Sequence, residues 1–187
     1  MMRNLTTAAE GKNYEMKDKK KLKIKQDEWN PYRSKWKAAI EKGLNILPKK
    51  EDNILYLGAS SGTTINHISK LTSGIIFAIE NSPKMAISLV KLATQKNNIA
   101  PIFSDAREIE FIEKSLFNKR IDILFQDIPS IDQVQILGKA SNLVDKNCKI
   151  LLSLKTQSIS QKSPKQTALE VKEQLRKYFK IYKIINS

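Results

Sequence analysis

The sequence reads Leu57-Gly58-Ala59-Ser60-Ser61-Gly62-Thr63-Thr64 at the point that decides the fold. This loop joins a short apolar strand, Ile54–Leu57, to a segment of helical spacing, Ile65–Leu71. Its two glycines let the backbone turn tightly and approach a ligand closely. The loop lacks both the Gly-x-Gly-x-x-Gly fingerprint of dinucleotide-binding folds and the Gly-Lys-Ser/Thr of a P-loop. It therefore predicts a ligand site, but not one for a dinucleotide or a nucleoside triphosphate.

Strands and helices alternate outward from this loop. Apolar runs predict further strands at Ile75–Ile79, Ile99–Phe103, Ile121–Phe125, Lys149–Leu154 and Lys180–Ile185. Helices are expected between them at Pro83–Gln95, Glu108–Phe117, Gln133–Val144 and Gln166–Tyr178, with an earlier one capped by Asn30 and running to Leu47. This order predicts an α/β, Rossmann-like fold with a mainly parallel central sheet and helices on both faces. Such folds bind ligands at the carboxyl ends of their strands.

The composition narrows the class of protein. The 187 residues suit one domain, and 33 Lys and Arg against 19 Asp and Glu leave a net charge of +14. This excess favours a polyanionic partner, although many lysines could simply solvate the surface. There is no apolar run of the roughly 18–20 residues that cross a bilayer, and no signal-peptide core. With Cys148 as the single cysteine, we expect a cytoplasmic protein with no membrane association and no metal site.

Two regions are expected along the chain. Residues 1–28 read as a short basic N-terminal segment, and residues 29–187 as one folded domain. Within the basic segment, the alternation of Leu22, Ile24 and Gln26 allows a short strand, and a disordered basic arm is the alternative.

Acidic side chains stand at the ends of three successive predicted strands. Glu80 can accept hydrogen bonds from both hydroxyls of a ribose, and Asp105 can accept from the exocyclic amine of an adenine. Asp127 ends the next strand. Each acid alone could be a surface carboxylate, but three of them behind a glycine loop fit a ligand with a ribose, a base and a positively charged end. S-adenosylmethionine is such a ligand, so a methyltransferase that uses this cofactor is expected.

Several motifs resemble the fibrillarin family in its archaeal, fibrillarin-like form, here shortened at both ends. They are Trp29–Lys35, Leu55–Thr64, Asp105–Arg107, Asp127 spaced from Asp132-Gln133, and Ser153–Lys155. The likeness extends over about residues 29–185. It implies a 2′-O-ribose methyltransferase acting on ribosomal RNA and, in archaea, also on transfer RNA. It also implies three kinds of partner: a box C/D guide RNA, a Nop-family scaffold protein and a kink-turn-binding ribosomal-type protein.

The resemblance implies two sets of site residues. The cofactor-binding set is Gly58, Ala59, Thr63, Thr64, Glu80, Asn81, Asp105, Ala106, Asp127, Ile128, Pro129 and Ser130. Lys35, Asp127 and Lys155 match three members of a Lys-Asp-Lys-His catalytic constellation. Such groups could orient a ribose 2′-hydroxyl and stabilise its developing negative charge. Without the resemblance, both lysines would be interpreted as solvent-facing.

The sequence also departs from the family pattern. A C-terminal hairpin with a Glu-x-Asp-His-like motif is usual, and its histidine has no counterpart before the last residue, Ser187. The single histidine, His67, is expected to have a helix-surface or packing role. Asn81 stands where Phe is usual, and Pro129-Ser130 replaces Ala-Gln. A catalytically impaired RNA-assembly subunit that retains the fold is therefore the alternative. The net charge disfavours a third candidate, a small-molecule methyltransferase.

Overall fold

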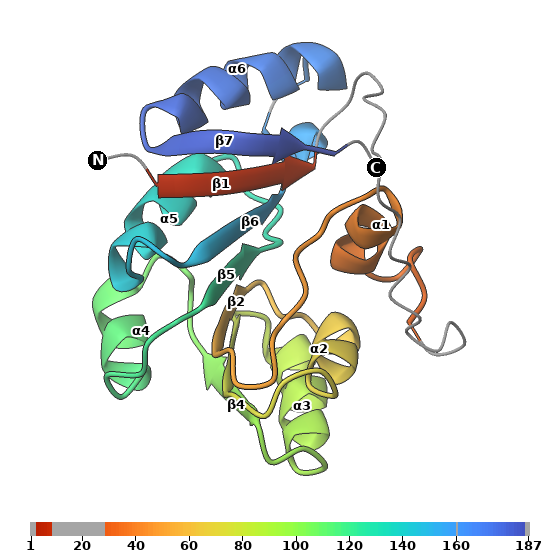
Figure 1. The fold of residues 1–187 in the computed structure, drawn as a ribbon, viewed down its shortest axis with the longest axis vertical. Helices are drawn as coiled ribbons and strands as arrows, with labels where there is room; N and C mark the ends of the chain where they lie inside the picture. Colours follow the sequence, from red (N-terminus) through yellow and green to blue (C-terminus); the bar gives the residue numbers. More distant parts are fainter. Residues whose placement is uncertain (1–2, 9–28, 160, 186–187) are drawn as a thin grey trace.

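The computed structural model describes residues 3–8, 29–159 and 161–185 (Figure 1). The strands are β1 (Arg3–Ala8), β2 (Ile54–Leu57), β3 (Ile76–Glu80), β4 (Ile99–Phe103), β5 (Ile123–Gln126), β6 (Lys149–Ser153) and β7 (Phe179–Ile184). The helices are α1 (Lys35–Glu41), α2 (Thr63–Ile68), α3 (Pro83–Ala93), α4 (Ile109–Ser115), α5 (Gln133–Ala140) and α6 (Pro164–Arg176). This order confirms the predicted alternation of strands and helices.

The strands form one sheet in the order β4-β3-β2-β5-β6-β1-β7, and every neighbouring pair is parallel. The chain order reverses at β2, which pairs with β3 on one side and β5 on the other. Ligands of doubly wound folds bind at such a switch point, beyond the carboxyl ends of the strands. The glycine loop that follows β2 therefore begins at the expected position.

Helices cover both faces of the sheet, because the buried strands point apolar side chains to both sides (Figure 1). Leu55 and Leu57 pack with residues of α4, α5 and α6, whereas Ile54 and Tyr56 pack with residues of α1, α2 and α3. A fully apolar strand such as β2 is what a parallel sheet covered on both faces requires. The predicted fold class is confirmed.

Strand β1 was not predicted. It lies between β6 and β7, with Ala8 opposite Ser153, so residues 3–8 belong to the central sheet. The short strand proposed around Ile24 lies outside the described residues. The boundary at residue 29 stays a prediction.

The predicted start of the first helix was wrong. The side chain of Asn30 accepts from the backbone N–H of Tyr32 at 2.8 Å, which makes a turn rather than a helix cap. The helix begins at Lys35, after Ser34, whose hydroxyl accepts from the backbone N–H of Lys37 at 3.2 Å. Serine in extended geometry satisfies the first free N–H groups of a helix, so Ser34 is the cap.

Candidate active site

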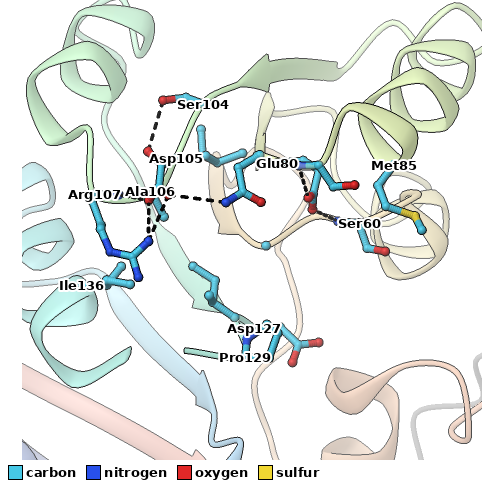
Figure 2. A pocket seen from close by; sticks show the side chains of 15 residues that line it. Ser60, Glu80, Met85, Ser104, Asp105, Ala106, Arg107, Asp127, Pro129 and Ile136 are labelled. Atoms are coloured by element: carbon cyan, nitrogen blue, oxygen red, sulfur yellow. Dashed lines mark hydrogen bonds and ion pairs between the residues drawn. The ribbon is translucent and has the colours of Figure 1, made fainter. Parts of the chain in front are cut away.

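A pocket of about 320 Å³ opens beyond the carboxyl ends of β2, β3, β4 and β5 (Figure 2). Its volume lies within the ~300–1,000 Å³ range of small-molecule sites. The lining residues are Gly58, Ser60, Ile79, Glu80, Asn81, Ser82, Met85, Ser104, Asp105, Ala106, Arg107, Asp127, Ile128, Pro129 and Ile136. The pocket thus gathers most of the predicted cofactor set. Ala59, Thr63, Thr64 and Ser130 lie outside its lining.

Gly58 brings the loop after β2 against the loop after β5. Its φ is +81°, and a Cβ at this position would lie 2.8 Å from the carbonyl oxygen of Asp127 and 2.9 Å from Ile128 Cγ1. The backbone N–H of Asp127 donates to Leu57 O at 2.9 Å. Only glycine permits both the left-handed conformation and this close approach.

We expect Gly58→Ala to lower the free energy of unfolding by roughly 2–3 kcal/mol, since it combines an unfavourable φ with a backbone collision. Urea denaturation measures this loss. Gly43 also has a positive φ, +92°, but lies outside the pocket lining. Gly43→Ala is therefore the control for the conformational cost alone. An equal loss of unfolding free energy in both variants would contradict the proposed collision of the new Cβ with the Asp127 backbone.

Glu80 ties the glycine loop to the segment before α3. Its carboxylate is 9% exposed and accepts from the backbone N–H of Ser60 at 2.6 Å and from that of Ser82 at 2.8 Å. A carboxylate oxygen can accept more than one hydrogen bond, so each retains capacity for a ligand hydroxyl. The position of Glu80 at a strand end predicted a role in ligand binding, but nothing in the sequence indicated that its carboxylate would also hold the backbone of Ser60 and Ser82.

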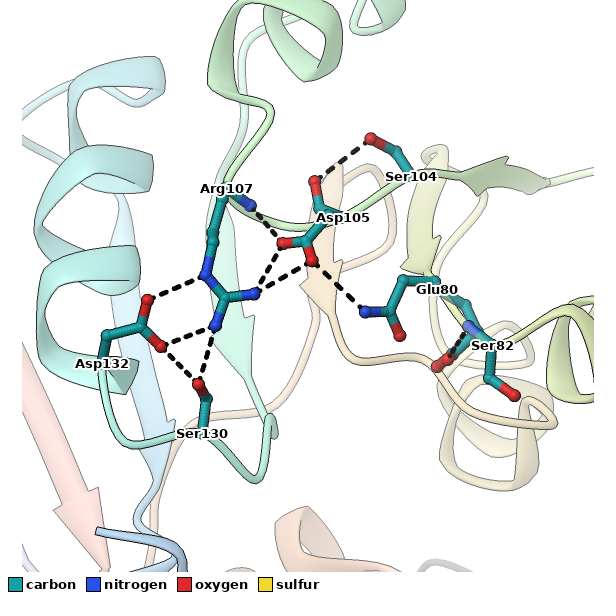
Figure 3. A network of polar contacts seen from close by, with 8 residues as sticks. Glu80, Ser82, Ser104, Asp105, Arg107, Ser130 and Asp132 are labelled. Atoms are coloured by element: carbon teal, nitrogen blue, oxygen red, sulfur yellow. Dashed lines mark hydrogen bonds and ion pairs between the residues drawn. The ribbon is translucent and has the colours of Figure 1, made fainter.

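Arg107 forms a bridge between the loops after β4 and β5 (Figure 3). Its Nη1 donates to both carboxylate oxygens of Asp105, at 3.0 and 3.1 Å. Its Nε and Nη2 donate to the two oxygens of Asp132, each at 2.8 Å, and Nη2 also donates to Ser130 Oγ at 2.9 Å. All three nitrogens of the guanidinium thus donate to side chains of these two loops. Arg107 thereby holds Asp105 at the pocket wall.

This bridge shifts the acidities of its members. Hydrogen bonds from Arg107 and Ser130 lower the pKa of Asp132 to about 2. Partial burial raises the pKa of Asp105, but the Arg107 backbone and guanidinium outweigh it, so the net pKa is lower than usual. The pKa of Arg107 is raised, chiefly by Asp132. Asp105 therefore faces a ligand as an anion at neutral pH.

The bridge predicts an acid-dependent loss of stability. The pKa of Asp132 in the folded protein is below its ordinary value of 3.8. The ionised side chain therefore stabilises the fold fully above pH 3.8, and this stabilisation is lost as the pH falls through about 2. We expect the free energy of unfolding of Arg107→Ala to fall less than that of the wild type between these two pH values. Denaturant titrations across this range measure the difference. Arg120→Ala, which removes a surface ion pair with Asp122, is the control. Parallel pH curves for wild type and Arg107→Ala would contradict the assignment.

Asp127 and Lys155 meet at the ends of the adjacent strands β5 and β6. Lys155 Nζ lies 2.7 Å from Asp127 Oδ1, and their side chains are 28% and 18% exposed. The carboxylate is therefore paired with an ammonium and still lines the ligand pocket, where a substrate can reach it. Such a pair can hold a hydroxyl and stabilise negative charge that develops on its oxygen.

Lys35 is not part of this ion pair. It is exposed at the first position of α1, and within residues 29–159 no contact joins its side chain to Asp127 or Lys155. The helix that carries it is nevertheless well anchored. Trp36 is 1% exposed, packs edge-on against Phe125 at 5.1 Å and donates to Ile46 O at 2.9 Å.

Tyr56 lies beneath the site and was missed by the sequence analysis. Burial raises its pKa, the negative charge of Asp127 raises it further, and a hydrogen bond with Thr64 partly opposes the rise. Thr64 in turn donates to Ser34 Oγ at 3.1 Å, which places Thr64 in a structural network rather than in the pocket lining. In the sequence of an apolar strand, a tyrosine below a ligand site has the same pattern of neighbours as a tyrosine in the core, so the role of Tyr56 could not be predicted.

His67 stacks on Trp29, with ring centroids 5.6 Å apart and an interplanar angle of 13°. The predicted packing role is confirmed. In the described part of the chain, no group of three or more His, Cys, Asp or Glu side chains is placed to hold a metal ion. None of the helices described there is long and apolar enough to span a membrane.

A sequence model of the fibrillarin family matches residues 2–186. The chain belongs to the fibrillarin family. It is 35% identical over 179 residues to the fibrillarin-like rRNA/tRNA 2′-O-methyltransferase of Methanocaldococcus jannaschii, covering 92% of this chain and 77% of that protein.

Solved fibrillarin structures share the fold of this family member. The Aeropyrum pernix fibrillarin, in complex with natively bound S-adenosyl-L-methionine, is similar with a TM-score of 0.70 at 32% identity. That match covers 80% of this chain and 66% of the Aeropyrum chain, so this chain spans only about two thirds of that relative. A fibrillarin/Nop5p complex is similar with a TM-score of 0.72 at 30% identity, covering 80% of this chain and 72% of that one.

Proposed function

We propose that this chain is an S-adenosylmethionine-dependent RNA 2′-O-ribose methyltransferase that acts on ribosomal and transfer RNA. The observation that carries the proposal is the Asp127–Lys155 ion pair, 2.7 Å long, because Asp127 also lines the ligand pocket. Family membership supports it, since the matched relatives include a named rRNA/tRNA 2′-O-methyltransferase and a fibrillarin with bound S-adenosyl-L-methionine.

The pocket chemistry fits this cofactor. Each carboxylate oxygen of Glu80 already accepts one hydrogen bond from the backbone and can accept another, so Glu80 would accept from the ribose hydroxyls. Asp105 would accept a hydrogen bond from the adenine amine. Apolar groups of Ile79, Met85 and Ile136 line the same pocket and suit a flat base. Three carboxylates and one guanidinium, that of Arg107, line the pocket, and the net negative charge complements a sulfonium cation.

The chain's own residues would prepare the acceptor. Bound S-adenosylmethionine supplies the electrophilic methyl group. Asp127 would accept a hydrogen bond from the ribose 2′-hydroxyl and take its proton, while Lys155 would stabilise the negative charge on that oxygen. Much of the rate would come from holding the hydroxyl in line with the methyl group. Lys35, exposed on α1, would contact the RNA or the reacting oxygen once RNA is bound.

The proposed setting is a box C/D guide ribonucleoprotein in the cytoplasm. The guide RNA would select the target nucleotide by base pairing, and the net charge of +14 would draw the chain to RNA phosphates. A Nop-family scaffold is the proposed protein partner, supported by the similar fibrillarin/Nop5p complex. A kink-turn-binding ribosomal-type protein would complete the particle.

Calorimetry with S-adenosylmethionine and a methyl-transfer assay with labelled cofactor test the proposal together. We expect saturable binding at one site and incorporation of label into guide-matched RNA. Binding without incorporation, in a particle where a longer relative is active, would instead support the catalytically impaired assembly subunit. Absence of binding would refute the cofactor assignment.

A further inference from the structure

Gln133 is completely buried at the first position of α5, and its side-chain amide pairs with the backbone of Lys155. Its Nε2 donates to Lys155 O at 3.2 Å, and its Oε1 accepts from Lys155 N at 3.1 Å. Nε2 also donates to Ser130 O at 2.8 Å. One amide therefore satisfies both backbone groups of the residue whose ammonium pairs with Asp127.

Among the described residues, β6 pairs with β5 as far as Leu152 and with β1 as far as Ser153. Lys155 lies beyond both pairings, so its backbone groups need another partner. The Gln133 amide binds the backbone of Lys155, two residues after Ser153, in the way that a neighbouring strand would. It thereby fixes the Cα position of Lys155, from which the side chain brings Nζ to 2.7 Å from Asp127.

Gln133 is itself held firmly. Its backbone oxygen accepts from Gln126 Nε2 at 2.7 Å, which ties the start of α5 to β5. The preceding residue, Asp132, is held by the Arg107 bridge. A buried amide is costly unless it is fully bonded, so an apolar residue would fill this space more cheaply if packing were its only role.

We propose that Gln133 is the positioning residue that sets the Lys155 ammonium against Asp127; this inference rests on the function proposed above. Gln133 does not line the ligand pocket. Its main effect therefore falls on the chemical step, and the effect on cofactor affinity, through the contact with Ser130 O, is expected to be the smaller one.

Gln133→Met keeps the volume of the side chain but removes its hydrogen bonds. In the assembled particle we expect kcat to fall about 10–100-fold at saturating S-adenosylmethionine, as expected for a misplaced catalytic group, with the cofactor Kd changed less than about twofold. Gln135→Met, on the exposed face of the same helix, should leave both values unchanged. Equal kcat in Gln133→Met and wild type would overturn the inference, whereas an inactive wild type would count against the proposed function.

Gln133→Glu provides a readout that a purely structural role would not move. A neutral carboxyl keeps one donor and one acceptor in place of the amide, whereas the ionised form only accepts. Because burial can raise the pKa of a glutamate to about 8–9, the activity of this variant relative to wild type should rise as the pH is lowered from about 8 to about 6. A ratio that does not change with pH would contradict the inference, even if Gln133→Met fails to fold.

A third readout is independent of activity. Reductive methylation with formaldehyde and a borohydride, followed by mass spectrometry, reports how readily Lys155 loses its ion pair. We expect Lys155 to react several-fold faster in Gln133→Met than in wild type, and an unchanged rate would overturn the inference.

Discussion

Asp127→Ala should reduce methyl transfer about 10³-fold or more while leaving the fold intact. The carboxylate is the group in the pocket that combines access for a substrate with a directly paired ammonium, Lys155, at 2.7 Å. Its loss removes the proton acceptor and leaves Lys155 without its anchor, and general-base contributions are typically 10²–10⁴-fold. Single-turnover transfer at saturating cofactor measures the effect, and thermal unfolding checks the fold.

Two further variants sharpen this test. Asp127→Asn keeps the shape of the side chain but not its basicity, so it should be nearly as inactive as Asp127→Ala. Asp145→Ala removes an exposed carboxylate that accepts from the backbone N–H of Asn147 at 2.8 Å, away from the pocket. It should transfer methyl groups at the wild-type rate. Unchanged turnover in Asp127→Ala would remove this residue from the site.

Glu80→Ala should weaken the binding of S-adenosylmethionine at least about 100-fold and affect RNA binding far less. The substitution removes a charged acceptor for two ribose hydroxyls, and hydrogen bonds to charged groups contribute about 1.5–3 kcal/mol each. It also releases Ser60 and Ser82, which the carboxylate holds at 2.6 and 2.8 Å. Calorimetry for the cofactor and salt titrations for RNA separate the two affinities.

The control for Glu80→Ala is Asp122→Ala. Asp122 also accepts from a backbone N–H, that of Asn53 at 2.9 Å, but lies outside the pocket lining. Any loss of cofactor affinity through general loosening of the sheet would therefore appear in both variants. A larger effect of Glu80→Ala on RNA than on the cofactor would contradict the ribose assignment.

The parts of the fold that were predicted correctly are those with a local signal. Strands β2 and β4 match the predicted Ile54–Leu57 and Ile99–Phe103, because each is a short continuous apolar run, buried throughout in β2 and partly exposed in the edge strand β4. Strand β1 lacks such a run, and its pairing partners lie more than a hundred residues away in β6 and β7. The predicted start of the first helix was wrong because Asn30 and Ser34 are both good caps, and the local sequence does not say which of them precedes the helix that buries Trp36.

The candidate site divides in the same way. The topology alone implies that acids at successive strand ends meet, and Glu80, Asp105 and Asp127 do line one pocket. The supporting contacts depend on side chains that are distant in sequence. Arg107 contacts Asp132, and Gln133 contacts Lys155. These contacts depend on the conformations of loops, which the spacing of apolar residues does not predict. The place of Lys35 in the catalytic set rests on the resemblance, and it remains a proposal.

The most direct test of the proposed function is methylation by the reconstituted particle with two guide RNAs. The chain would be combined with a Nop-family scaffold, a kink-turn-binding protein and labelled cofactor, and each guide would pair a different nucleotide of one target RNA. Mass spectrometry of the digested target locates the modification. We predict a single 2′-O-methyl group that moves with the guide and disappears with Asp127→Asn. Three results would contradict the proposed function. They are a methyl group on a base, a methylated position that does not change with the guide RNA, and no methylation under conditions in which the same particle is active with a longer relative in place of this chain.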